Sequence, residues 1–246
     1  MKYLLLLDYD GTLVPIVGRP ELAALSVDRK QVLRTLSRQP GIKMAIISGR
    51  KLADIKKQIS IPGIIYIGNH GFEIEAGKRV NIHPAAKRFG PVLKAVKSAL
   101  VRAIKVKGAF IEDKGFTLSL HYRMVKRGNL KAFLRAYREA IKPWRNKVKI
   151  TEGKKVFEVR PPVKWDKGEA IKWMIKGMGL GKYLPIYIGD DRTDEDAFKA
   201  LKDNGLTFAV GGAKRSHAKY HFRSIAGVYG FLSNIEDEVR KYSVSC

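Results

Sequence analysis

The sequence predicts an α/β fold: a Rossmann-like, doubly wound parallel sheet that is interrupted by an inserted α+β domain. Two observations carry this prediction. Apolar runs of strand length alternate with helical patterns up to residue 67, and the same alternation resumes after residue 161. Between these stretches the pattern changes to amphipathic strands and long helices. Strands that are apolar throughout are typical of parallel sheets covered by helices on both faces.

The two outer stretches supply the parallel sheet and its helices. Each predicted helix shows apolar residues at helical spacing, and each predicted strand is a short apolar run. In the first stretch we expect strands at 2–7, 42–47 and 64–67 and helices at 26–38 and 51–58. In the second we expect helices at 167–178, 195–201 and 227–241 and strands at 184–188 and 207–210.

The middle stretch, residues 83–160, predicts an α+β domain with antiparallel strand pairs. The segment Asp113-Lys114-Gly115 is typical of a hairpin turn. We expect helices at 84–104 and 130–141 and strands at 108–113, 116–122, 148–150 and 156–159. The predicted domains are therefore a core of residues 1–82 and 161–246 and an insert of residues 83–160.

Positive charge is concentrated in the insert. The chain of 246 residues has a formal net charge of +25, and residues 83–160 hold 21 Lys and Arg against 5 Asp and Glu. A basic insert facing an acidic site would attract small anionic ligands, while a solvated lysine-rich surface and a nucleic-acid surface are the alternatives. Because the lysines lie singly among apolar residues, without the aromatic pattern of an RNA-reading domain, no nucleic-acid partner is expected.

Two further features limit the class of protein. The apolar run of residues 4–7 is too short to span a membrane and ends at Asp8, so we expect no membrane partner and a cytoplasmic location. Cys246 is the only cysteine, which excludes an intramolecular disulfide and a cysteine-based metal cluster. The sequence gives no indication of the oligomeric state.

The first predicted strand ends in two aspartates, Asp8 and Asp10, followed by Gly11. Side chains two residues apart on a strand point to the same side, so both carboxylates would face one site. Two such charges need a cation or a shared proton, which indicates either a metal site or a nucleophile beside an acid. A simple strand end is the alternative, since Asp and Gly commonly stop strands.

Three other polar clusters follow predicted strands or begin predicted helices. Ser48-Gly49-Arg50 begins a helix, where a hydroxyl and free backbone N–H groups suit a phosphate. Lys167 also begins a helix and would supply a cation. Residues 189–196 contain five acidic side chains among eight. Helix capping explains Thr193 or Asp194 but explains poorly why Asp190 and Asp191 precede them, whereas Mg²⁺ prefers such oxygen ligands.

In order and spacing, these clusters resemble the four motifs of the haloacid dehalogenase (HAD) phosphatases. Longer strings are similar to the trehalose-6-phosphate phosphatase family within that superfamily, and they occur in both the core and the insert. They are residues 10–16, 47–50, 68–71, 121–123, 153–161, 165–168 and 189–198. The resemblance implies that the insert is a cap that selects the sugar, with Mg²⁺ as the cofactor.

The resemblance also implies roles for individual residues of the core. Asp8 would be the nucleophile that forms an aspartyl-phosphate, and Asp10 the general acid and base. Ser48 and Lys167 would hold the phosphoryl oxygens. Asp8, Asp10 and Asp190 would bind the metal. The roles of Asp191 and Asp194 are left open by the resemblance. One of them reaches the metal through water or orients Lys167, or both only cap a helix.

The same resemblance implies a set of substrate-binding residues. On the core these are Ser48, Gly49, Arg50 and His70, although His70 could be a structural histidine. On the insert they are Glu112, Arg123, Lys154 and Glu158, for which a surface ion network is the alternative.

Together these inferences predict a Mg²⁺-dependent trehalose-6-phosphate phosphatase that acts on a small sugar phosphate. A HAD phosphatase for another sugar phosphate, such as a glucosylglycerol, sucrose or mannosylglycerate phosphate, would have the same core motifs. A non-catalytic protein that binds anions or nucleic acid through the basic insert is the alternative from another class.

Overall fold

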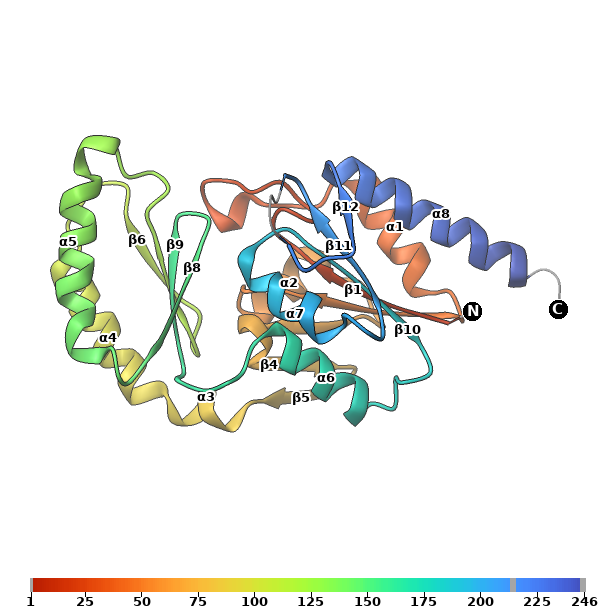
Figure 1. Cartoon of the computed structure of the whole chain (residues 1–246), viewed down its shortest axis with the longest axis horizontal. Helices are drawn as coiled ribbons and strands as arrows, with labels where there is room; N and C mark the ends of the chain where they lie inside the picture. The colour runs from red at the N-terminus through yellow and green to blue at the C-terminus, as the bar shows by residue number, and fades with distance from the viewer. Residues whose placement is uncertain (1, 213–215, 244–246) are drawn as a thin grey trace. The chain divides into compact units, whose positions relative to one another are not determined.

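The computed structural model describes residues 2–212 and 216–243. The described chain divides into two compact units: residues up to Asn81 together with those from Trp165 onward, called here the core unit, and Ile82–Lys164, called the inserted unit. The core unit is an α/β fold and the inserted unit an α+β fold (Figure 1). The predicted fold class is therefore confirmed.

The core sheet has eight strands in the order β12-β11-β10-β1-β2-β3-β4-β5. From β12 to β3 all neighbours are parallel, and β4 is antiparallel to β3. The strands are β1 (Tyr3–Asp8), β2 (Ile42–Ile47), β3 (Ile65–Gly68), β4 (Glu73–Ala76), β5 (Arg79–Ile82), β10 (Leu184–Gly189), β11 (Leu206–Val210) and β12 (Tyr220–Phe222).

Helices cover both faces of this sheet (Figure 1). The helices α1 (Val27–Ser37), α2 (Leu52–Ile59) and α8 (Ile225–Ser243) pack on the face that receives Leu5 and Leu7 of β1. The helices α6 (Lys167–Gly177) and α7 (Glu195–Ala200) pack on the face of Leu4 and Leu6. Because successive residues of β1 are buried on opposite faces, the strand is apolar throughout.

In the inserted unit, two long helices pack on one face of an antiparallel sheet of order β6-β7-β9-β8. The strands are β6 (Phe110–Asp113), β7 (Leu118–His121), β8 (Lys149–Gly153) and β9 (Val156–Arg160). The helices are α3 (Pro84–Arg88), α4 (Gly90–Ala103) and α5 (Leu130–Ile141). Short 3-10 helices occur at Pro20–Leu22, Asn69–Gly71, Arg127–Asn129, Lys142–Trp144 and Arg192–Asp194.

Several element predictions were wrong in detail. The single helix expected at 84–104 is two helices that meet at Phe89-Gly90, where Pro91 cannot donate a backbone hydrogen bond. The strand expected from Gly108 begins at Phe110, because Gly108 has φ +93° and lies in a turn. The strands β4, β5 and β12 were not predicted. In the described parts of the chain, no helix is long and apolar enough to cross a membrane.

Candidate active site

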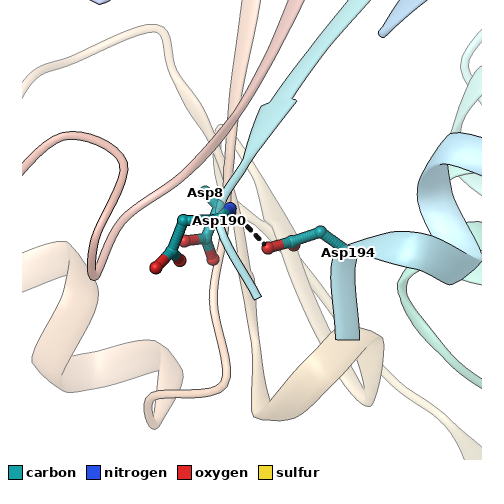
Figure 2. Close-up of side chains that lie close together, drawn as sticks. All are labelled: Asp8, Asp190 and Asp194. Carbon is teal, nitrogen blue, oxygen red and sulfur yellow. Dashed lines mark hydrogen bonds between the residues drawn. The ribbon is translucent and has the colours of Figure 1, made fainter. Parts of the chain in front are cut away.

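The carboxyl ends of three adjacent parallel strands bring the acidic motifs together. β1 lies between β10 and β2, so Asp8 at the end of β1 is flanked by Ser48 after β2 and Asp190 after β10. One carboxylate oxygen from each of Asp8, Asp190 and Asp194 lies within 4.8 Å of the others. Figure 2 shows these three side chains close together. Ligands of open α/β sheets bind at this edge.

Lys167 is the cation of this cluster. Asp166 caps helix α6 by accepting a hydrogen bond from Glu169 N at 3.0 Å, which places Lys167 in the first turn. The Lys167 Nζ donates to Asp8 Oδ1 at 2.7 Å and to Asp194 Oδ1 at 2.6 Å. Lys167, Asp8 and Asp194 are all buried.

Burial and neighbouring charges have opposite effects on the pKa values of Asp8 and Lys167. Burial raises the pKa of Asp8 well above its ordinary range, and Lys167 opposes that rise. Burial alone would lower the pKa of Lys167, but Asp194 and Asp8 raise it above its ordinary value. Lys167 therefore stays charged, and an additional cation at the cluster would favour ionised Asp8.

Asp194 has all of its acceptor positions in use. Its Oδ1 accepts from Lys167 Nζ and from Tyr187 Oη, each at 2.6 Å. Its Oδ2 accepts from the backbone N–H groups of Asp190 and Asp191, each at 2.9 Å. A carboxylate offers about four lone-pair positions, so this arrangement favours a role in orienting Lys167 over binding a metal.

The turn after β1 fits a metal at Asp8 and Asp190. Gly11 has φ +87°, a conformation that favours glycine, and a Cβ there would overlap the Asp190 carboxylate. The backbone of this turn and a second carboxylate therefore lie together beside Asp8. Oxygen ligands of this kind are those that Mg²⁺ prefers.

Asp10 and Arg50 form an ion pair in this structure. The Arg50 Nε donates to Asp10 Oδ2 and its Nη2 to Asp10 Oδ1, both at 2.7 Å. The guanidinium carbon also lies 5.2 Å from the centre of the Tyr9 ring. Arg50 was expected among the substrate-binding residues. In this structure its guanidinium binds the carboxylate of Asp10, the candidate general acid and base.

The next residues of the candidate site are Ser48, Gly49 and His70, which lie close to one another. Ser48 is buried, and its Oγ accepts from Arg50 N at 3.1 Å. A Cβ at Gly49 would lie 2.6 Å from His70 Nε2, so glycine allows the buried His70 to pack here. The His70 backbone has φ +57°.

The residues predicted on the inserted unit fall into two groups. Glu112 and Glu158 lie on either side of Ser119 in the strand register, and so share the sheet face opposite the helices. Glu158 Oε1 accepts from Ser119 Oγ at 2.6 Å and Lys114 Nζ at 3.0 Å, and Glu112 Oε2 lies 2.7 Å from His121 Nε2. The second group is Arg123, whose Nη2 donates to the backbone oxygen of Lys154 at 2.8 Å.

Comparison with known proteins decides the family. A trehalose-phosphatase family model matches residues 6–225. The chain belongs to the trehalose-phosphatase family. It is 34% identical to probable trehalose-phosphate phosphatase D of Arabidopsis thaliana over 95% of this chain and 67% of that protein. Trehalose-phosphate phosphatase B of the same plant is 33% identical over 98% and 68%.

Solved structures agree with this assignment. The C-terminal domain of C. albicans trehalose-6-phosphate phosphatase has a TM-score of 0.82 and 26% identity, covering 96% of this chain and 92% of that one. A haloacid dehalogenase-like hydrolase from Bacteroides thetaiotaomicron, with a TM-score of 0.67 and 17% identity over 96% and 100%, shows the fold alone. As a trehalose phosphatase, the protein is a phosphomonoester hydrolase with the HAD fold.

Sequence reasoning missed four side chains of this trehalose phosphatase that contact the predicted residues. Ser119 and His121 occupy alternate positions of β7, so strand periodicity opposite Glu112 could have indicated both. Lys114 lies in the hairpin turn and Tyr187 within an apolar strand. No local pattern distinguishes these two: the partner of Lys114, Glu158, is 44 residues away, and a tyrosine in an apolar strand reads as an ordinary core residue.

Proposed function

We propose that the protein hydrolyses trehalose 6-phosphate to trehalose and phosphate through an aspartyl-phosphate on Asp8. The observation that carries this proposal is the buried Lys167, which lies between Asp8 and Asp194 at the carboxyl end of β1 in a chain of the trehalose-phosphatase family. A charged amine beside a buried carboxylate suits a site that must both hold and receive a phosphoryl group.

In the first step, a carboxylate oxygen of Asp8 attacks phosphorus and the bond from phosphorus to the sugar oxygen breaks. Asp10 donates a proton to that leaving oxygen. In the second step, water attacks the phosphorus of the aspartyl-phosphate while Asp10 accepts its proton, and phosphate leaves with Asp8 restored. Ser48 and Lys167 would hold the phosphoryl oxygens, and Arg50 would keep the Asp10 carboxylate in place.

The donor set fits Mg²⁺. The carboxylates of Asp8 and Asp190 and the backbone carbonyl of Asp10 would hold the ion. Asp194 would orient Lys167, because its four acceptor positions are used, and Asp191 would begin the 3-10 helix at Arg192–Asp194. When bound, the ion would neutralise charge on the phosphoryl oxygens.

Selection of the sugar would lie with the insert, residues 83–160, as a cap domain, and the chemistry with a core of residues 1–82 and 161–246. Glu112, Glu158, Arg123 and Lys154 would bind sugar hydroxyl groups, joined on the sheet face by Ser119. Directional polar side chains of this kind suit a disaccharide, because each hydroxyl needs a donor or acceptor. Gly49 and His70 would border the phosphate end.

Phosphate release from a panel of sugar phosphates tests this function. The panel is trehalose 6-phosphate and the phosphates of sucrose, glucosylglycerol and mannosylglycerate, each with Mg²⁺ and with excess EDTA. We expect the highest kcat/KM on trehalose 6-phosphate and loss of turnover in EDTA that added Mg²⁺ restores. Faster hydrolysis of another sugar phosphate would overturn the substrate, and full turnover in EDTA would overturn the metal requirement.

A further inference from the structure

Tyr187 is a buried residue of β10 that reaches the candidate active site from within the sheet. Its ring lies on the face covered by α6 and α7, and it packs edge-on against Phe198 with ring centres 5.6 Å apart. Its side chain is fully buried. Its hydroxyl nevertheless donates to Asp194 Oδ1 at 2.6 Å.

The hydroxyl is the first link of a chain of hydrogen bonds that ends at Asp8. The same Asp194 oxygen accepts from Lys167 Nζ at 2.6 Å, and Lys167 Nζ donates to Asp8 Oδ1 at 2.7 Å. All four side chains are buried, so water does not compete for these bonds. This chain of four side chains therefore connects the interior of the core unit, at Tyr187, to the carboxyl end of β1, at Asp8.

The other oxygen of Asp194 is fixed by the backbone. Its Oδ2 accepts from the N–H groups of Asp190 and Asp191, so the carboxylate cannot rotate without losing two hydrogen bonds. With Tyr187 on one side of Oδ1, the remaining lone pair faces Lys167. Burial raises the pKa of Tyr187 well above its ordinary value, so the hydroxyl keeps the proton that it donates.

We propose that Tyr187 is a positioning residue for phosphoryl transfer: through Asp194 it fixes the Lys167 ammonium where it contacts Asp8 and the phosphoryl oxygens. This inference rests on the function proposed above. Without the hydroxyl, Lys167 is the only donor to Asp194 Oδ1 among the described residues. The ammonium then moves toward Asp194 and away from Asp8.

Tyr187→Phe tests the proposal, with Tyr66→Phe as the matched control. Tyr66 is a buried tyrosine of β3 whose hydroxyl accepts from Ile61 N at 3.0 Å and donates to Ile61 O at 2.9 Å. Each variant loses one buried hydroxyl, but only Tyr187 is linked to Lys167. Both are to be assayed on trehalose 6-phosphate and on p-nitrophenyl phosphate, alongside their melting temperatures.

We expect Tyr187→Phe to lower kcat at least about tenfold on both substrates, the lower end of the effect of one lost hydrogen bond to a charged group, with KM changed less than about twofold. We expect Tyr66→Phe to melt at a similar temperature and to keep its kcat. In a crystal structure of Tyr187→Phe, Lys167 Nζ is expected outside hydrogen-bond distance of Asp8. Equal kcat in the two variants, or an unmoved Lys167, would overturn the proposal.

Two further outcomes can be distinguished from a failure of the Tyr187 proposal. If the wild-type protein hydrolyses p-nitrophenyl phosphate but not trehalose 6-phosphate, the proposed substrate is wrong and the Tyr187 comparison is still decided on the first compound. If Tyr187→Phe does not fold, Asp194→Asn breaks the next link of the chain. That variant is expected to lose at least as much kcat with Lys167 displaced, and a retained kcat would contradict the chain.

Discussion

Arg50 binds the Asp10 carboxylate with two nitrogens, a geometry that lysine cannot reproduce. We expect Arg50→Lys to lower kcat on trehalose 6-phosphate about tenfold, because the acid and base loses its bidentate partner. Steady-state kinetics measure this. Arg34→Lys, which alters an arginine bound to Gln31, is the control and should keep its kcat. Unchanged kcat in Arg50→Lys would show that the ion pair does not position Asp10.

Gly11 and Gly63 separate the effect of backbone strain from that of the metal site. Both have positive φ, +87° and +81°, but a Cβ at Gly11 would overlap Asp190 whereas a Cβ at Gly63 meets nothing within 4 Å. We expect Gly11→Ala to weaken Mg²⁺ binding at least about tenfold in calorimetry, because Asp190 must move. Gly63→Ala should cost about 1 kcal/mol of stability and leave Mg²⁺ binding unchanged. Equal Mg²⁺ affinities would contradict a metal site beside Gly11.

From the sequence, the polar residues that the structure gathers at one sheet edge could be predicted, but not their partners. Asp8, Ser48, Lys167 and Asp190 follow strands or begin helices, so the general rule for parallel sheets brings them to one edge. The Arg50–Asp10 ion pair was not predicted, because a guanidinium in a helix-start motif has several possible partners and only packing selects one. Tyr187 was also missed. In an apolar strand, the sequence does not show that the hydroxyl of a buried tyrosine has a polar partner.

At the scale of elements, Glu195 at the start of α7 binds Ser216 and His217, which follow β11 in the chain. Its carboxylate accepts from Ser216 Oγ at 2.7 Å and from the backbone N–H of His217 at 2.8 Å. Burial would raise the pKa of Glu195, but these hydrogen bonds and His217 lower it below its ordinary value. A carboxyl with a lowered pKa stabilises the folded state above its ordinary pKa, and this contribution is lost as the pH falls through the folded-state value.

We therefore expect Glu195→Gln to reduce the free energy of unfolding by about 1 kcal/mol at pH 7 and by less as the pH falls below the ordinary glutamate range. Urea unfolding between pH 7 and pH 3 measures the difference. Glu169→Gln, which breaks an exposed pair with Lys172, should change stability by less than about 0.5 kcal/mol throughout. A difference at Glu195 that does not shrink in acid would contradict the assignment.

Element boundaries depended on how long and how apolar each segment is. The central strands β1, β2 and β10 are continuous apolar runs, and their prediction from sequence succeeded. The edge strand β5 is exposed over most of its length and β12 has three residues, so neither shows an apolar pattern. The break between α3 and α4 at Phe89-Gly90 interrupts a helical pattern that continues on both sides.

At the scale of the whole molecule, positive charge is concentrated on the helices of the inserted unit and the turns that adjoin them. Residues 84–107 and 126–147 contain 15 Lys and Arg and one acidic residue, Glu139. Lys131, Arg135 and Arg138 lie along one exposed stripe of α5. These helices pack on the sheet face opposite Glu112 and Glu158, so under the proposed function this charge would act on an anionic substrate over distance and not by contact with the sugar.

We expect kcat/KM for trehalose 6-phosphate to fall severalfold between about 20 mM and 300 mM NaCl, because salt screens the attraction of an anionic substrate. Replacing Lys131, Arg135 and Arg138 by Gln should reduce this salt dependence. The same replacement of Lys172, Lys176 and Lys182 in the core unit is the charge-matched control. A kcat/KM that does not respond to salt would show that the field of the insert does not assist binding.

The central claim is that Asp8 receives the phosphoryl group, and phosphate release by Asp8→Asn tests it most directly. Asp28→Asn, in the first turn of α1, is the control for a lost aspartate away from the strand end. With trehalose 6-phosphate and Mg²⁺ we expect Asp8→Asn to lower kcat at least about a thousandfold while remaining folded, and Asp28→Asn to leave it unchanged. An Asp8→Asn protein with kcat within about twofold of wild type would contradict the account.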